Sequence, residues 1–180
     1  MRRLMLLRHA KTEHGAPSGR DQDRRLDGRG RNDAKEIGGW IGRHPPFPDR
    51  VLVSPAVRAY QTWEIAREAM KHQAPPPHVE LLPELYGADP SELLQSIRME
   101  SSTDPRRLML VGHNPGMHEL ALALTGSGDA ARRKALADNL PTSGLAVFDF
   151  AIDDWDDVAF RRGKLVLFVS PKLLKQTSGD

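Results

Sequence analysis

A chain of 180 residues with 39% hydrophobic residues is long enough for one domain with a substantial core and short for two. We therefore expect a single domain over residues 1–171 and a frayed tail at residues 172–180. The net charge of +2 is too small to favour nucleic acid as a partner, although the sequence pI is near 9.1. The absence of cysteine excludes disulfides, thiolate metal ligands and a cysteine nucleophile.

The chain opens on a short apolar run. Its stretch at residues 4–7 falls short of the roughly seven to fifteen residues of a signal-peptide core. No apolar run approaches the roughly twenty residues that a membrane-spanning helix needs. We therefore expect a cytoplasmic protein, not a membrane protein, whose first apolar run is a buried strand.

The first half of the chain alternates apolar runs with segments of helical spacing. In chain order we predict a strand at 4–7, a loop at 12–27, a helix at 30–41, a strand at 50–53 and a helix at 55–70. Ser54 is a favoured N-cap, and Pro55 is favoured at the first helical position. This pair therefore predicts where the second helix begins.

The second half continues the alternation and ends in a hairpin. In chain order we predict a strand at 79–82, a helix at 91–99, a strand at 108–111, helices at 115–124 and 130–140, and strands at 145–150 and 164–169. Ser91 and Asn114 are the expected caps of the first two helices. The segment Gly126-Ser127-Gly128 predicts a break after the helix at 115–124. An acidic turn at 153–157 predicts that the last two strands pair as a hairpin.

Strands that alternate with helices predict an α/β fold. We expect a three-layer α/β/α sandwich around a mostly parallel, mixed central sheet. In such sheets, ligands bind beyond the carboxyl ends of the strands, next to the helices that follow. Three apolar strands here end in polar residues: Arg8 and His9, then Ser54 with Arg58 a turn later, and then His113. If the three strands are neighbours, two histidines and two arginines converge.

These side chains suit a phosphoryl group. The guanidinium fork of arginine matches phosphate oxygens, so Arg8 and Arg58 are candidate phosphate ligands. A neutral histidine is a plausible nucleophile at phosphorus, and a second histidine can stabilise the transferring oxygens. Glu84, in a turn after a predicted strand, is the best-placed carboxylate to protonate a leaving group.

Three loop residues are further candidates for contact with substrate, namely Lys11, Thr12 and Ser143. His118 follows His113 by five residues, which is not the helix-face spacing of zinc proteases. We expect neither a metal ion nor a cofactor.

The three segments together resemble the histidine phosphatase superfamily, also called the phosphoglycerate mutase-like or RHG family. Residues 7–13 (LRHAKTE) are similar to its Arg-His-Gly motif, with Ala10 where glycine is usual. Residues 54–62 (SPAVRAYQT) are similar to its Ser-x-x-x-Arg-Ala-x-x-Thr segment, and residues 111–114 (VGHN) to its Gly-His segment. Within the superfamily, the short chain and the opening motif resemble the small SixA-like phosphohistidine phosphatases.

The resemblance implies a nucleophile at His9 and a phosphoryl group held by Arg8, Arg58 and His113, with Arg24 as a further contact. Glu84 matches the family's acid imperfectly, because its spacing to the following glycine is one residue shorter than in the mutase branch. An imidazole leaving group departs more readily than an alkoxide and needs less help from an acid. This mismatch therefore favours phosphohistidine as the substrate.

The sequence predicts a metal-independent phosphatase that forms a phosphohistidine intermediate and acts on protein phosphohistidine or another phosphomonoester. Two alternatives stay open at this point. One is a phosphatase or mutase that acts on a small phosphorylated metabolite. The other is a non-catalytic module that binds a phosphorylated partner. A nucleic-acid-binding role is not expected, because no interleaved aromatics or recognisable motif accompany the arginines.

Overall fold

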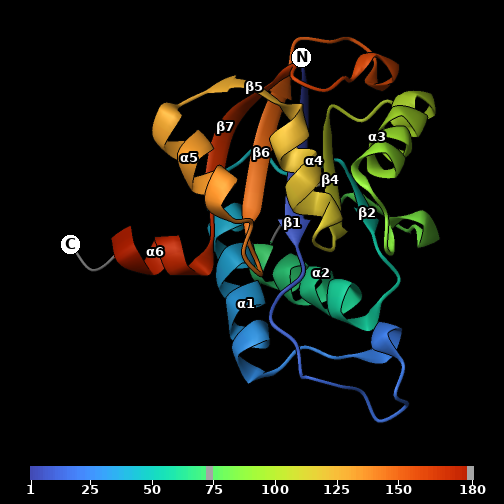
Figure 1. Cartoon of the computed structure of the whole chain (residues 1–180), viewed down its shortest axis with the longest axis vertical. Coiled ribbons are helices and arrows are strands. Elements are labelled where there is room, and N and C mark those ends of the chain that lie inside the picture. Colours follow the sequence, from blue (N-terminus) through green and yellow to red (C-terminus); the bar gives the residue numbers. More distant parts are fainter. Residues whose placement is uncertain (72–74, 178–180) are drawn as a thin grey trace.

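The computed structural model describes residues 1–71 and 75–177, and its strands and helices alternate largely as predicted (Figure 1). The strands are β1 (Arg2–Arg8), β2 (Arg50–Val53), β3 (His78–Leu81), β4 (Arg107–Gly112), β5 (Thr125–Gly128), β6 (Leu145–Phe150) and β7 (Gly163–Val169). The α-helices are α1 (Gly28–Gly42), α2 (Val57–Met70), α3 (Pro90–Arg98), α4 (Gly116–Leu124), α5 (Ala130–Asp138) and α6 (Pro171–Thr177). Short 3-10 helices include η1 (Asp21–Asp23), η2 (Pro83–Leu85) and η3 (Met99–Ser102).

The strands form one sheet in the order β3-β2-β4-β1-β6-β7-β5. The four strands from β3 to β1 are parallel to one another. Strand β6 is antiparallel to β1 and to β7, and β5 is parallel to β7. The predicted mixed, mostly parallel sheet and the C-terminal hairpin are therefore confirmed. Because β2, β4 and β1 are adjacent and parallel, their carboxyl ends meet at one edge of the sheet.

Helices cover both faces of the sheet. Successive side chains of β1 point to opposite faces, so they belong to two different hydrophobic cores. Leu4 and Leu6 pack into a core with side chains of α3, α4 and α5. Met5 and Leu7 pack into a second core with side chains of α1 and α2. The three-layer α/β/α architecture is therefore also confirmed (Figure 1).

The N-terminal caps of three helices, α2, α3 and α4, differ from the prediction. Helix α2 starts at Val57, and its N-cap position is Ala56, so Ser54 does not cap it. Helix α3 is capped by Asp89, in a capping box with the Glu92 side chain, and not by Ser91. The Asp89 carboxylate lies two residues before Ser91 in the sequence and accepts the backbone N–H of Glu92.

Helix α4 starts at Gly116, after Pro115 as its N-cap position. The Asn114 side chain still accepts the backbone N–H of His118 (N···O 3.2 Å), so it satisfies a free donor of the first turn from one position further out. Asn114 therefore does serve the start of α4, although it is not the N-cap residue.

The predicted break in the helix at residues 126–128 is confirmed, because α4 ends at Leu124 and α5 begins at Ala130. The sequence did not predict that these residues would also form the edge strand β5. Glycine permits this pairing through close backbone approach. A Cβ atom at Gly126 would lie 1.9 Å from the carbonyl oxygen of Arg161, a residue of the segment that leads into β7. Glycine therefore ends the helix, as predicted, and also allows a short edge strand between α4 and α5.

The expected frayed tail is wrong over most of its length, because α6 continues to residue 177. Leu173 donates its backbone N–H to the Ser170 hydroxyl (3.2 Å), and Leu174 packs against the core beneath α1 and α2. Residues 178–180 of the predicted tail lie outside the described residues. Within residues 1–71 and 75–177, no helix is long and apolar enough to cross a membrane.

Candidate active site

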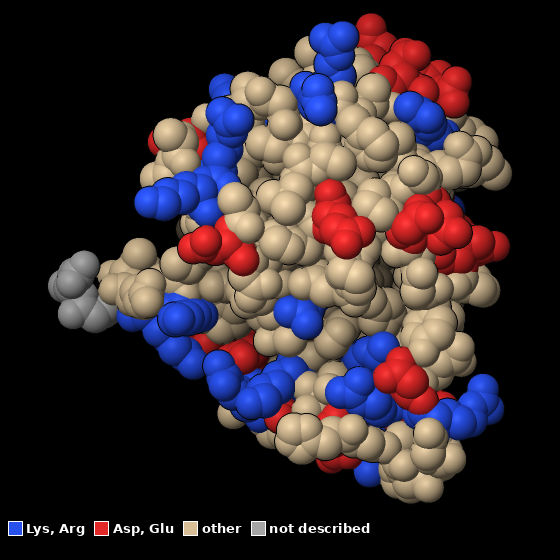
Figure 2. Space-filling model, in the orientation of Figure 1, with Lys and Arg blue, Asp and Glu red and all other residues tan. Residues whose placement is uncertain are grey.

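Side chains from the carboxyl ends of β1, β2 and β4 line one cavity of about 390 Å³. Its lining holds three histidines and four cationic side chains, which are His9, His14, His113, Arg8, Lys11, Arg24 and Arg58. Figure 2 shows Lys and Arg side chains gathered in the lower part of the face, around α1, α2 and the segment that follows β1. The structure therefore brings together the residues that the three strand ends were expected to supply.

His9 follows β1, and its hydrogen bonds fix how the imidazole is presented. Its backbone N–H donates to the carbonyl oxygen of Gly112 (3.0 Å), and ring Nδ1 lies 2.8 Å from the carbonyl oxygen of Ala10. Because a carbonyl oxygen can only accept, Nδ1 carries the proton of the neutral ring and Nε2 keeps its lone pair. Burial, together with the charges of Arg8 and Arg58, lowers the pKa of His9 to about 4. The ring is therefore neutral at pH 7.

His113 follows β4 and faces His9, with a distance of 5.3 Å between the ring centroids. Its Nε2 lies 2.7 Å from the hydroxyl oxygen of Ser54. Ser54 was expected to cap α2, but its hydroxyl instead contacts His113. The Tyr86 ring meets it edge-on at 5.5 Å. Burial, and then the charges of His9 and Arg58, lower the pKa of His113 to about 3, so it too is neutral at pH 7.

Two buried nitrogen donors at this cavity have no hydrogen-bond partner among the residues that the structure describes. They are Nε of Arg8 and Nδ1 of His113. Arg8 is anchored by another of its donors, Nη1, which donates to the carbonyl oxygen of Leu140 (3.1 Å). Buried donors are almost always satisfied in proteins, and both of these belong to side chains that line the cavity. The lining is therefore suited to an anion with several acceptor oxygens.

Arg58 lies in the first turn of α2 and is held by Asp21. The guanidinium is only 7% exposed, and it donates to the backbone carbonyl oxygen of Asp21 (2.8 Å) and to its carboxylate (2.9 Å). The Tyr86 hydroxyl donates to the same carboxylate (2.6 Å). These hydrogen bonds, from Tyr86 and then from Arg58, hold the pKa of Asp21 well below its usual range, whereas the bond to Asp21 raises the pKa of Tyr86.

Asp21 and Tyr86 were not predicted as site residues from the sequence. They come from η1 and from the residue after η2, 65 positions apart, and no local spacing relates the two. Only the fold brings these loops together over Arg58.

The loop after β1 carries Lys11, Thr12 and Arg24, which were predicted to contact the substrate. Arg24 donates to the Thr12 hydroxyl (2.6 Å) and to the carbonyl oxygen of Glu13 (3.2 Å), and both Arg24 and Thr12 line the cavity. Lys11 also lines the cavity and is exposed. The Thr62 hydroxyl accepts the backbone N–H of Ala10 (2.9 Å) and so ties this loop to α2.

Ser143 has a different place from the one expected. It is fully buried and is not among the side chains that line the cavity, whereas its neighbour Thr142 is. The backbone N–H of Ser143 lies 3.1 Å from the carbonyl oxygen of Arg8 and 3.2 Å from that of His9, so it supports these residues from behind. Sequence reasoning also missed His14 and Asn114 as lining residues.

Glu84 does not lie in this cavity. It is exposed on η2 and lines a second cavity on the other side of that segment. The prediction that Glu84 protonates the leaving group is therefore corrected, because Glu84 lies outside the histidine cavity and none of the described side chains that line that cavity is a carboxylate. Within residues 1–71 and 75–177, no group of three or more His, Asp or Glu side chains is placed to hold a metal ion.

Fold and site together define an α/β protein with a basic cavity at the carboxyl ends of its strands, in which the rings of His9 and His113 face each other. Residues 4–114 match the model of the histidine phosphatase superfamily (branch 1), and the chain belongs to that family. An uncharacterized protein of Mycobacterium leprae is 36% identical over 172 residues, which cover 92% of this chain and all of the relative.

Two solved structures of similar length carry the same fold. One, from Agrobacterium tumefaciens, is 33% identical with a TM-score of 0.76, and the match covers 94% of this chain and 99% of the other. The second, from Nakamurella multipartitia, is 26% identical with a TM-score of 0.78, and the match covers 94% and 96% of the two chains. Both are named as candidate phosphohistidine phosphatases of the SixA type.

Proposed function

We propose that this protein is a phosphatase that forms a phosphohistidine intermediate on His9 and prefers protein phosphohistidine as its substrate. One observation carries the proposal. Within the described residues, a neutral histidine whose Nε2 keeps its lone pair lies beside buried donors of Arg8 and His113 that have no partner. This arrangement supplies a nucleophile together with donors for the oxygens of a phosphoryl group.

In the first step, the lone pair on Nε2 of His9 attacks phosphorus in line with the leaving group. A P–N bond forms at His9 as the bond to the leaving group breaks. The hydrogen bond from Nδ1 to the carbonyl oxygen of Ala10 stabilises the positive charge that develops on the ring. Arg8 and Arg58 bind the non-bridging oxygens of the phosphoryl group.

His113 has a defined role in this step. When the Ser54 hydroxyl donates to Nε2 of His113, the ring proton lies on Nδ1. Nδ1 is the buried nitrogen without a partner, so it is free to donate to a phosphoryl oxygen as charge builds up there. In the second step, water attacks the phosphorus of the intermediate, the P–N bond to His9 breaks, and inorganic phosphate leaves.

The preference for phosphohistidine rests on the absence of a carboxylate from the side chains that line the cavity. An alkoxide leaving group needs a proton from an acid, and Glu84 is not placed to give one. An imidazole leaving group departs more readily and takes its proton from water. The similarity to two proteins named as candidate phosphohistidine phosphatases agrees with this choice.

The test compares release of phosphate from a phosphohistidine protein and from a panel of sugar and glycerate phosphates, all in the presence of a metal chelator. We expect turnover of phosphohistidine in chelator, and at least tenfold lower kcat/KM on the metabolites. His9→Ala should abolish release, whereas His78→Ala, on the exposed strand β3, should not. Faster turnover of a metabolite would favour a small-molecule phosphatase, and undiminished turnover by His9→Ala would refute the proposed nucleophile.

A further inference from the structure

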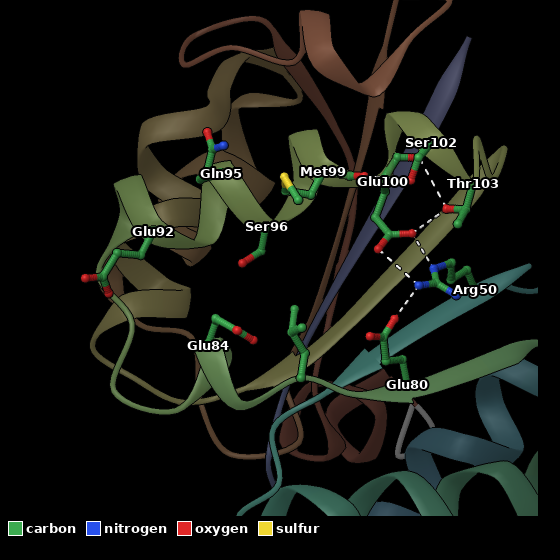
Figure 3. A pocket seen from close by; sticks show the side chains of 11 residues that line it. Arg50, Glu80, Glu84, Glu92, Gln95, Ser96, Met99, Glu100, Ser102 and Thr103 are labelled. Atoms are coloured by element: carbon green, nitrogen blue, oxygen red, sulfur yellow. Dashed lines mark hydrogen bonds and ion pairs between the residues drawn. The ribbon is translucent and has the colours of Figure 1, made fainter.

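A second cavity, of about 560 Å³, lies between the β2–β3 end of the sheet and the segment formed by α3 and η3 (Figure 3). Its charged lining consists of one arginine and four glutamates, which are Arg50, Glu80, Glu84, Glu92 and Glu100. It shares no lining residue with the histidine cavity. Figure 2 shows acidic side chains gathered at the right of the molecule, over α3 and the segment that follows β3.

The positive charge of Arg50 is already used within the protein. Its guanidinium is paired with the carboxylates of Glu100 and Glu80. Glu100 also accepts the Thr103 hydroxyl (2.6 Å). Arg50 is therefore shared by two of the four carboxylates, and its single positive charge leaves the cavity lining negative overall.

The remaining carboxylates belong to Glu84 and Glu92. One oxygen of Glu92 accepts the backbone N–H of Asp89 (3.1 Å) in the capping box of α3, which leaves its other oxygen available. Glu84 has no hydrogen-bond or ion-pair partner among the residues that the structure describes. This end of the cavity therefore carries acceptor oxygens that are not used by the fold.

Ser96 is an independent sign of a ligand site. The residue is only 8% exposed, and its hydroxyl has no hydrogen-bond partner in the described part of the chain. Figure 3 shows this hydroxyl pointing from α3 into the same space that the Glu84 carboxylate enters from η2. The hydroxyl of this largely buried residue therefore faces the cavity and is available to a hydrogen-bonding group of a ligand.

Apolar surface lies beside these polar groups. Leu82 and Met99 line the cavity, and Met99 is 66% exposed. A matching ligand carries a positive charge with several N–H donors at one end and a hydrocarbon chain behind it. Alkylguanidinium and alkylammonium groups have this chemistry, with the charge suited to carboxylates and the chain to apolar surface.

We propose that this cavity binds an organic cation of the alkylguanidinium or alkylammonium class through Glu84, Glu92 and Ser96. Two sources present this group, namely a small free cation and an arginine or lysine side chain on a partner polypeptide. The site is separate from the histidine cavity, so its existence does not depend on the proposed phosphatase activity.

The test is calorimetric titration of the whole chain with Nα-acetyl-arginine methylamide, a guanidinium without a free carboxylate. We expect saturable binding, and no binding of the citrulline analogue, which has the same shape without the charge. Glu84→Gln should weaken binding about tenfold, as expected for the loss of a charge-assisted hydrogen bond. Ser96→Ala should weaken it by a smaller factor.

Two comparisons complete the test. Glu68→Gln changes an exposed carboxylate on α2 outside the cavity and should leave the affinity unchanged. Tighter binding of the diamine putrescine than of a short arginine peptide would identify a free cation, and the reverse order would identify a partner side chain. Equal affinity for the arginine and citrulline compounds, or full affinity in Glu84→Gln, would overturn the proposal.

Discussion

The two cavities on either side of η2 are opposite in charge. The histidine cavity has four cationic side chains and no carboxylate in its lining, whereas the cavity beneath α3 has four carboxylates and one arginine. The acidic cavity is the larger of the two, at about 560 Å³ against about 390 Å³. Charge and unsatisfied hydrogen-bonding groups, and not size, therefore distinguish the site suited to a phosphoryl group from the site suited to a cation.

The same short segment contributes to both cavities. Glu84 lies within η2 and enters the acidic cavity, while Tyr86, which follows η2, contacts Asp21 and His113 at the histidine cavity. A 3-10 helix advances by about 120° per residue, so side chains two positions apart point in different directions. The segment thereby separates an acidic side chain from the phosphate-binding side chains, and the predictions below test that separation.

The largest effect is expected for Arg8→Gln, which removes a buried guanidinium from the histidine cavity. Loss of a donor aimed at developing negative charge costs roughly 10²–10³-fold in rate, so we expect kcat/KM to fall by that factor. Steady-state kinetics measure it, with thermal unfolding as the check that the variant folds. Arg43→Gln, at the exposed end of α1, is the matched control. A loss of less than about threefold would contradict the assignment of Arg8.

A smaller loss is expected for Asp21→Asn, because Asp21 acts through Arg58 and does not line the cavity. Misplacement of a binding group lowers the rate of the chemical step, so we expect kcat to fall roughly tenfold while KM changes little. Tyr86→Phe removes only one hydrogen bond to the same carboxylate and should have a weaker effect in the same direction. An unchanged kcat in Asp21→Asn would show that Arg58 needs no such support.

The pH dependence of stability is expected to follow the two site histidines. Their pKa values, about 4 and about 3, lie below the ordinary value of about 6.5. As the pH falls below that value, the unfolded chain takes up protons that the folded chain does not, so the free energy of unfolding decreases. Urea unfolding should show a loss of roughly 2 kcal/mol per histidine between pH 6.5 and 4.5.

His113→Gln removes one of these titrating groups, so its stability should vary less with pH over the same interval. A slope identical to that of the parent chain would contradict the lowered pKa of His113.

The smallest effect is expected for Glu84→Gln. Because Glu84 lies outside the histidine cavity, hydrolysis of phosphohistidine should stay within about twofold of the parent rate, while cation binding in the acidic cavity weakens. Parallel kinetics and calorimetry on one preparation make the comparison. A tenfold loss of hydrolysis would show that Glu84 takes part in catalysis.

The sequence predicts much of the site, because strand ends are local features and the rules of parallel sheets bring them together. Arg8, His9, Arg58 and His113 each follow or flank an apolar strand, and β1, β2 and β4 are adjacent as that reasoning requires. What failed depended on tertiary contacts. Ser54 has the sequence context of a helix cap, but its hydroxyl is used by His113 from the neighbouring strand.

Side-chain direction in turns was also beyond the reach of the sequence pattern. Glu84 follows a strand that was correctly expected, yet the rotation of η2 turns its carboxylate away from the histidines. Ser143 adopts a positive φ of 59° and is buried behind Arg8 and His9, outside the lining of the cavity. Both outcomes are set by backbone rotations over one or two residues, which composition and periodicity do not encode.

The central claim is that His9 carries the phosphoryl group between the two steps. Rapid quench of the enzyme with ³²P-labelled phosphohistidine protein, followed by peptide mapping under alkaline conditions that preserve phosphohistidine, measures this directly. We predict label on the peptide that contains His9, formed before phosphate is released and absent in His9→Ala. Phosphate release without any label on His9, or label on His113, would contradict the account.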